Sequence, residues 1–303
     1  MQEVRGSIPL SSTIFFGERR NMKLGVHVSI AGHIYEAVDR AAALGCNTFQ
    51  IFSRNPRGWA ALALSPVDAE EFIRRRKVEK MTPVVVHIPY LINLCSPDDA
   101  LWEKSVKAYI EDIKRADALG ADYFVTHLGS PKDKGRVYGI ERFSKGMAKA
   151  IRKAGPKLMI LLENTAGGGS SIGSKFEDIA EIIKNVKSQT GTDIGMCLDT
   201  AHAFEAGHDD KTGKGFMSMM NNIGSTVGFG RIKVVHFNDS LSTMGSHNDR
   251  HWHIGKGKIG AEGLKRIVNH PKLKNCAFIL ETPKNTKKDD KANLAAVRKM
   301  RRG

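Results

Sequence analysis

Apolar residues recur along the chain in two alternating patterns. Short runs rich in Val, Ile, Leu and Phe are typical of buried strands, and each is followed by a longer segment with apolar residues at i, i+3 and i+4, which form one face of a helix. The runs that predict strands cover residues 24–30, 47–53, 83–89, 122–129, 157–165, 193–202, 232–240 and 276–283. This alternation predicts one (β/α)8 barrel, the TIM-barrel fold of the α/β class. An open doubly wound sheet is the alternative, but no G-x-G-x-x-G motif follows the first run.

Residue types at the ends of the helical segments support this division. In the segment 174–190, Ser174 and Glu177 have the spacing of a capping box, which predicts Ser174 as the N-cap. Gly45 and Gly120 end two other helical segments, and we expect both in the left-handed conformation that closes a helix.

The first residues of the chain differ from the rest. Residues 1–21 are broken by Pro and Ser and do not have the pattern of a signal peptide. Met22 comes directly before the first predicted strand. We therefore expect residues 1–21 to be an N-terminal extension, disordered or not native, and residues 22–303 to form a single barrel domain.

Composition is that of a globular protein, and its charge favours an anionic partner, although basic proteins without one are common. Of its 303 residues, 41% are hydrophobic and 26% charged, and the net charge of +15 favours a polyanion such as nucleic acid. The four cysteines form no C-x-x-C pair, which indicates reduced thiols in a cytoplasmic protein. No apolar run is long enough to predict a membrane span.

Histidines and carboxylates end most of the predicted strands. Catalytic residues of TIM barrels lie at the carboxyl ends of the strands, where they share one mouth. One such residue alone is more often a core histidine or a capped carboxylate, but six are expected to converge here. They are His87, His127, Glu163, Asp199, His236 and Glu281. Buried without partners, their carboxylates would cost several kcal/mol, and bound cations remove that cost.

Three further residues extend this set. His202 follows Asp199 by three residues, and Asp249 and His251 lie two apart in the loop after residues 232–240, a spacing that points both the same way in an extended segment. Five histidines and four carboxylates exceed the ligands of one tetrahedral ion, and the lack of Cys favours catalytic zinc or manganese. Three ions that share one carboxylate would take about three ligands each, and such centres clamp the attacking and leaving oxygens of a phosphodiester.

Long motifs in a fixed order resemble the endonuclease IV family of apurinic/apyrimidinic endonucleases, within the xylose isomerase-like TIM barrels. The resemblance runs from about Lys23 to the final helix. Its motifs are GVHVSIAGH, QIFSRNPRGW, HIPYLINL, HLGS, LLENTAGGG, LDTAHAFEAGHD, HFNDS, DRHWHIGKGKIG and ILETP. Lys256, His33 and His208 depart from the residues common in the family, but none belongs to the set of nine.

The resemblance implies three zinc ions, with manganese as an alternative at one site. The ligands of the first ion would be His87, His127 and Glu163. Those of the second would be Glu163, Asp199, His236 and Glu281, and those of the third would be His202, Asp249 and His251. It also implies catalytic roles for Glu163 and Glu281. His27 would be a supporting residue and not a ligand.

The resemblance further implies a substrate and an activity. Arg57, Tyr90 and Leu91 match loop residues that enter the minor groove and hold the DNA bent. The implied enzyme is a cytoplasmic monomer, nucleoid-associated if the cell is bacterial, that cuts duplex DNA 5′ to an abasic site and removes 3′-blocking groups. It would leave a 3′-hydroxyl and a 5′-deoxyribose phosphate.

Two other functions are compatible with parts of the sequence. A sugar isomerase or epimerase on the same barrel would use one or two metals, which leaves His202, Asp249 and His251 without a role. A DNA-binding protein without catalysis would explain the positive charge but not the nine potential ligands. Metal content separates the three alternatives.

Overall fold

The computed structural model describes residues 22–60 and 62–301, so the expected N-terminal extension lies outside the described residues. Eight parallel strands form one sheet in the order β1-β10-β7-β6-β5-β4-β3-β2. A bridge between His27 and Gln50 brings the first and last strands of this order together, which closes the barrel. The strands are β1 (Lys23–Val26), β2 (Phe49–Phe52), β3 (Val84–His87), β4 (Tyr123–Thr126), β5 (Met159–Glu163), β6 (Gly195–Asp199), β7 (Ile232–His236) and β10 (Ala277–Leu280). The predicted (β/α)8 barrel is confirmed.

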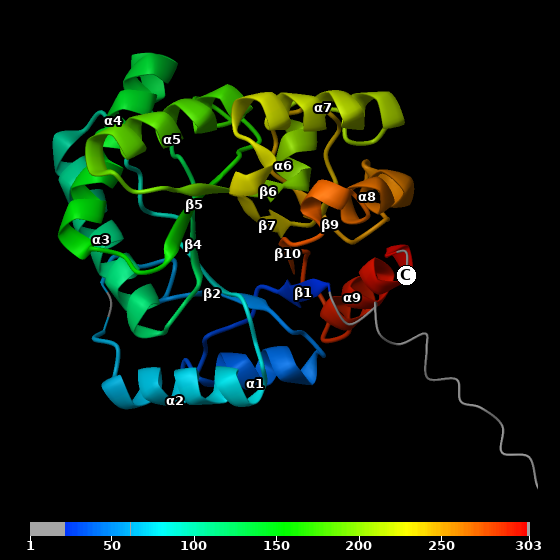
Figure 1. Ribbon diagram of the computed structural model, residues 1–303, viewed down its shortest axis with the longest axis horizontal. Helices are drawn as coiled ribbons and strands as arrows, with labels where there is room; N and C mark the ends of the chain where they lie inside the picture. The colour runs from blue at the N-terminus through cyan, green and yellow to red at the C-terminus, as the bar shows by residue number, and fades with distance from the viewer. Residues whose placement is uncertain (1–21, 61, 302–303) are drawn as a thin grey trace, which may run out of the picture.

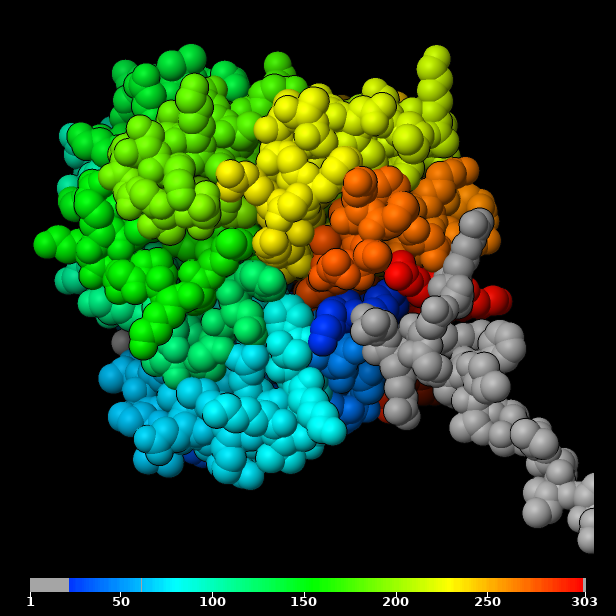
Figure 2. All heavy atoms as spheres, in the orientation of Figure 1, coloured from blue at the N-terminus to red at the C-terminus, as the bar shows by residue number. Residues whose placement is uncertain are grey.

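Helices surround the strands and follow one another round the molecule in chain order (Figures 1 and 2). They are α1 (Glu36–Ala43), α2 (Pro66–Val78), α3 (Asp99–Ala118), α4 (Gly135–Ala154), α5 (Phe176–Thr190), α6 (Thr200–Glu205), α7 (Gly213–Thr226), α8 (Gly260–Val268) and α9 (Asp289–Met300). Short 3-10 helices in the described residues are η2 (Lys132–Lys134), η3 (Phe229–Arg231) and η4 (Pro271–Leu273). The loop after β7 adds a small antiparallel pair, β8 (Asp239–Ser240) and β9 (His251–Trp252). No helix in the described part of the chain is long and apolar enough to cross a membrane.

The barrel interior is a small apolar cluster of its own, separate from the larger core between the strands and the helices. Its fully or almost fully buried members are Val85, Val125, Leu161, Cys197, Val234, Ala277 and Ile279. Side chains two positions apart on a strand point the same way. The next inward positions after Val85, Val125, Leu161, Cys197, Val234 and Ile279 are therefore the six strand-end residues His87, His127, Glu163, Asp199, His236 and Glu281. Strand alternation thus stacks the polar residues on an apolar floor.

The capping box expected at Ser174 is wrong. Helix α5 begins at Phe176 with Lys175 at its N-cap, and no side chain caps it. Asp178 in the first turn instead accepts the N–H of Gly173 (2.8 Å), and this buried carboxylate fixes the entry of the chain into the helix.

The glycine expectation is confirmed. Gly45 and Gly120 have φ angles of 70° and 63°, in the left-handed region where a Cβ is costly. Both follow the last residues of their helices, α1 and α3, and turn the chain toward the next strand. The four cysteines are free and buried, as expected.

Candidate metal centre

A cavity of about 420 Å³ opens at the carboxyl ends of the strands, and it is lined by residues of the predicted site. Those residues are His87, His127, His202, Asp249, His251 and Glu281, with Tyr90 and His27 beside them. Glu163, Asp199 and His236 are fully buried beneath it. All nine proposed ligands therefore lie in or directly below one mouth of the barrel.

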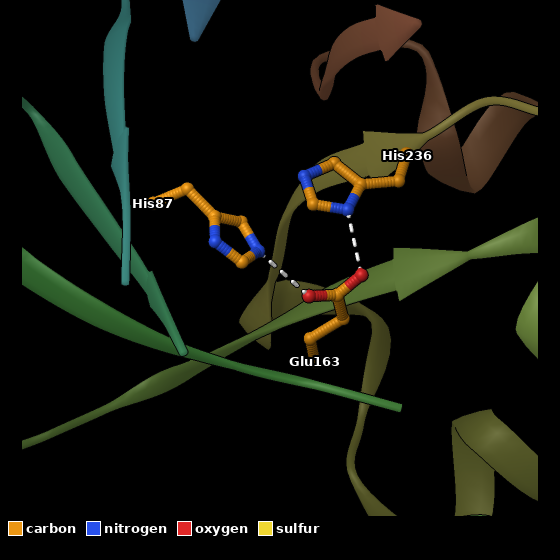
Figure 3. Close-up of side chains that lie close together, drawn as sticks. All are labelled: His87, Glu163 and His236. Atoms are coloured by element: carbon orange, nitrogen blue, oxygen red, sulfur yellow. Dashed lines mark hydrogen bonds and ion pairs between the residues drawn. The ribbon is translucent and has the colours of Figure 1, made fainter. Parts of the chain in front are cut away.

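Glu163 lies between the imidazoles of His87 and His236 (Figure 3). Its Oε2 is 3.1 Å from Nε2 of His87 and 3.7 Å from Nδ1 of His127. Its other oxygen, Oε1, is 2.7 Å from Nδ1 of His236. The two oxygens thus face different imidazoles, which is the arrangement that a carboxylate shared between two ions requires.

A second group forms around His236. Its Nδ1 lies 3.2 Å from Oε2 of Glu281 and 3.9 Å from Oδ2 of Asp199. Donor atoms of Glu163, Asp199, His236 and Glu281 all lie within 4.8 Å of one another, and this group could hold a metal ion.

The third group comprises His202, Asp249 and His251, called the loop cluster below. Nε2 of His202 lies 3.2 Å from Oδ2 of Asp249, and Nε2 of His251 lies 3.5 Å from Oδ1 of the same carboxylate. Asp199 is also close, because its Oδ2 is 3.4 Å from Nε2 of His251. Asp199 therefore lies between the second group and the loop cluster.

Backbone carbonyls orient several of these imidazoles. The Nδ1 groups of His87, His202 and His251 donate to the carbonyl oxygens of Ile88 (2.8 Å), Asn164 (2.9 Å) and Glu281 (3.3 Å). Each ring thus directs its Nε2 toward the carboxylates of the cavity, and this is the nitrogen through which it could bind a metal ion.

Two buried nitrogens test whether these residues fit a metal. Nε2 of His202 and Nε2 of His251 are buried and lie 3.2–3.5 Å from carboxylate oxygens, but they make no hydrogen bond of good geometry within residues 22–60 and 62–301. Buried polar atoms are normally paired, so two such nitrogens on either side of one carboxylate fit a cation. The oxygen and nitrogen donors suit zinc or manganese.

The pKa shifts reflect the density of charge in the cavity. Burial lowers the pKa of His127 to about 4, so this imidazole is neutral at pH 7 and available as a ligand. Burial opposes ionisation of Glu163, but the charge of His236 and hydrogen bonds from His236 and His87 hold its pKa well below the usual range. Glu163 is therefore an anion, as a bridging ligand must be.

Three amide side chains that the sequence analysis missed support the ligands. Buried Gln50 accepts a hydrogen bond from Nε2 of His236 (2.8 Å) and donates to Oε1 of Glu281 (2.6 Å). Asn238 donates to Oδ2 of Asp199 (2.9 Å), and Asn164 donates to the Asp199 carbonyl (2.9 Å). Gln50 is the one polar residue within the strand FQIF, and that interruption was the available signal.

The proposed DNA-contacting residues lie on neighbouring loops. Tyr90 lines the cavity with 66% of its surface exposed, and its ring meets the edge of Phe52 at 5.4 Å. Leu91 is exposed beside it, and Arg57 is exposed on the loop after β2. His27 contacts a proposed ligand, because its Nδ1 lies 3.4 Å from Oε1 of Glu281.

Comparisons with known proteins place this barrel and its site in a family. Residues 38–302 match the family of xylose isomerase-like TIM barrels. The chain is 46% identical over 275 residues to a probable endonuclease 4 of Halothermothrix orenii, covering 90% of this chain and 98% of that protein. It is also similar to the crystal structure of endonuclease IV from Thermus thermophilus, with a TM-score of 0.82 and 40% identity over 92% of this chain and 98% of that one.

The chain is therefore a xylose isomerase-like TIM barrel. Within that class it belongs to the endonuclease IV family, as its motifs predicted. A D-tagatose 3-epimerase-like protein shares the fold at 20% identity and a TM-score of 0.66, covering 92% of this chain and 96% of that one. At that identity the likeness concerns the barrel alone.

Proposed function

We propose that the protein is a DNA-repair endonuclease that hydrolyses the phosphodiester 5′ to abasic sites in duplex DNA. The products would be a 3′-hydroxyl and a 5′-deoxyribose phosphate, and the same site would remove 3′-blocking groups. The observation that carries the proposal is the loop cluster, in which two imidazole nitrogens face Asp249 next to two other ligand groups.

The nine ligands would hold three zinc ions, or two zinc ions and one manganese. When bound, such ions stabilise the negative charge that develops on a phosphodiester and on its leaving oxygen. Glu163 would be a ligand shared by two ions, because its two oxygens face the different imidazoles of His87 and His236. Glu281, held by the Gln50 amide, would keep its other oxygen directed at the second group.

The loops above the cavity would position the substrate. Tyr90 and Leu91 present exposed apolar surface beside the metal ligands, where a side chain can replace stacking lost at an abasic nucleotide. Arg57 would contact the backbone or the opened base stack, and the net charge of +15 would attract the duplex. We place the enzyme in the cytoplasm, on the nucleoid if the cell is bacterial, acting as a monomer.

The direct test is incubation of the zinc-loaded protein with a labelled duplex that carries one tetrahydrofuran abasic analogue. We expect a single nick 5′ to the analogue and no cleavage of the matched undamaged duplex. Intact duplex after incubation with protein that holds its full complement of metal would refute the proposed activity.

A further inference from the structure

Glu205 is a buried carboxylate at the end of α6, three residues after His202. It belongs to none of the three ligand groups, and its Oε2 has no hydrogen-bond partner in the described ranges 22–60 and 62–301. A buried carboxylate that is only half paired disfavours folding. Its contacts through the other oxygen indicate what it contributes.

Oε1 of Glu205 contacts both sides of the β8–β9 pair. It accepts the hydroxyl of Ser240 on β8 (2.6 Å) and the backbone N–H of Arg250 directly before β9 (3.1 Å). Ser240 and His251 are paired across this small sheet. One oxygen atom therefore bridges the two chain segments at the point where the loop carrying Asp249 and His251 begins and ends.

The β8–β9 pair is short and depends on contacts with neighbouring segments. Each strand has two residues, and so short an antiparallel pair is marginal in water. The loop between them is largely exposed, including Asp249 at 59% of its side-chain surface. Two backbone hydrogen bonds also connect this loop to the end of α6. The N–H of Gly245 donates to the carbonyl of Phe204, and the N–H of His247 donates to the carbonyl of Glu205.

We propose that Glu205 is a positioning residue that sets the geometry of the loop cluster. Helix α6 carries His202, while the segment clamped by Glu205 carries Asp249 and His251. The two hydrogen bonds to Oε1 join helix α6 to this segment. They therefore fix the distance from the imidazole of His202 to Asp249 and His251. The proposal rests on the proposed function only in that it takes the loop cluster to bind a metal ion.

The clamp depends on an acceptor at Oε1 and not on the negative charge. Glutamine has an oxygen in the same place, so Glu205→Gln should keep both hydrogen bonds, whereas Glu205→Ala removes them. Glu163 and its imidazole partners His87 and His236 lie on β5, β3 and β7, whereas the hydrogen bonds of Glu205 go to the segments that carry Asp249 and His251. We therefore expect Glu205→Ala to lower the affinity for metal at one of the three sites, the one formed by the loop cluster.

The test is competitive titration of the metal-free protein with zinc against a chromophoric chelator, repeated with cobalt for its absorption spectrum. We expect Glu205→Ala to weaken one site at least tenfold and leave the other two within about threefold of the wild type, while Glu205→Gln stays within about threefold at every site. Wild-type affinity in Glu205→Ala, or equal losses in the two variants, would overturn the proposal.

A second variant keeps the test decisive if Glu205→Ala does not fold. Ser240→Ala removes one of the two contacts of Oε1, so we expect a smaller loss, about threefold to tenfold, at the same single site. Unchanged zinc binding in Ser240→Ala would contradict the clamp. Failure of the wild type to bind a third ion would instead count against the proposed function itself.

Discussion

Asp210, in the loop between α6 and α7, provides a sharp test of how this barrel handles buried charge. Its side chain is fully buried, and neither carboxylate oxygen has a hydrogen-bond partner within the described part of the chain. Burial raises its pKa well above the usual value, and the negative charges of Asp239, Asp209 and Asp199 raise it further. The folded protein therefore keeps this carboxyl group protonated at a pH where the unfolded chain has released the proton.

The sign of the effect on stability follows from this difference. Because the folded state binds the proton more tightly, the free energy of unfolding falls as pH rises from the ordinary carboxyl range, near pH 4, to the pH at which the folded group ionises. The fall is about 1.4 kcal/mol for each pH unit in that window. Asparagine is nearly isosteric and has no proton to lose, so Asp210→Asn should abolish this contribution.

We expect Asp210→Asn to match the wild type near pH 4 and to exceed it progressively at higher pH. A difference of 1 kcal/mol corresponds to roughly 2–4 °C in Tm for a domain somewhat smaller than this one. The assay is urea unfolding followed by circular dichroism from pH 4 to pH 8, in excess chelator so that metal binding does not contribute.

The neighbouring Asp209 is the matched control. It is partly buried, which would raise its pKa, but hydrogen bonds from the Thr212 hydroxyl (2.5 Å) and the Thr212 and Lys211 N–H groups hold its pKa below the usual value. Its contribution to stability is present above the ordinary carboxyl pKa and is lost as pH falls, so Asp209→Asn should destabilise the protein at pH 7. An Asp210→Asn variant that is less stable at pH 8, or whose difference from the wild type does not change with pH, would refute the reasoning.

Three further predictions concern the metal centre and the DNA-contacting loops. Glu163→Gln should retain duplex binding but lose nicking, and single-turnover assays that leave more than about a tenth of the wild-type kcat, a loss under ~1.4 kcal/mol, would contradict the bridging role. Asp249→Asn or His251→Ala should lower the zinc content by one ion of three and slow nicking by about two to four decades, less for substrates with better leaving groups. Arg57→Ala and Tyr90→Ala should weaken binding to abasic duplex in fluorescence anisotropy while zinc content stays that of the wild type, and loss of zinc in either would show that the residue serves the metal site.

Much of the site could be predicted because strand alternation is a simple rule. Val85 and His87 lie two apart on one strand, and Leu161 and Glu163 repeat the pattern on another, so both polar side chains emerge above the same apolar floor. The buried runs also predicted the number of strands. Their order in the sheet follows the chain.

Other features depend on contacts between residues distant in the chain, which a single sequence does not reveal. Gln50 reaches Glu281, and Asn238 reaches Asp199, only because the closed barrel brings their strands together. The capping box at Ser174 was wrong for a related reason. Its spacing was suitable, but the entry to α5 is fixed by Asp178 and the N–H of Gly173.

The most direct test of the account is the metal content of the purified protein after dialysis against trace zinc, measured by inductively coupled plasma mass spectrometry. Two ligand groups share Glu163, and the loop cluster approaches them through Asp199, so we predict three zinc ions per chain, or two zinc ions and one manganese. One or two ions per chain, with the same metal content in Asp249→Asn, would contradict a trinuclear centre. The loop cluster would then be an ordinary polar loop that binds no metal.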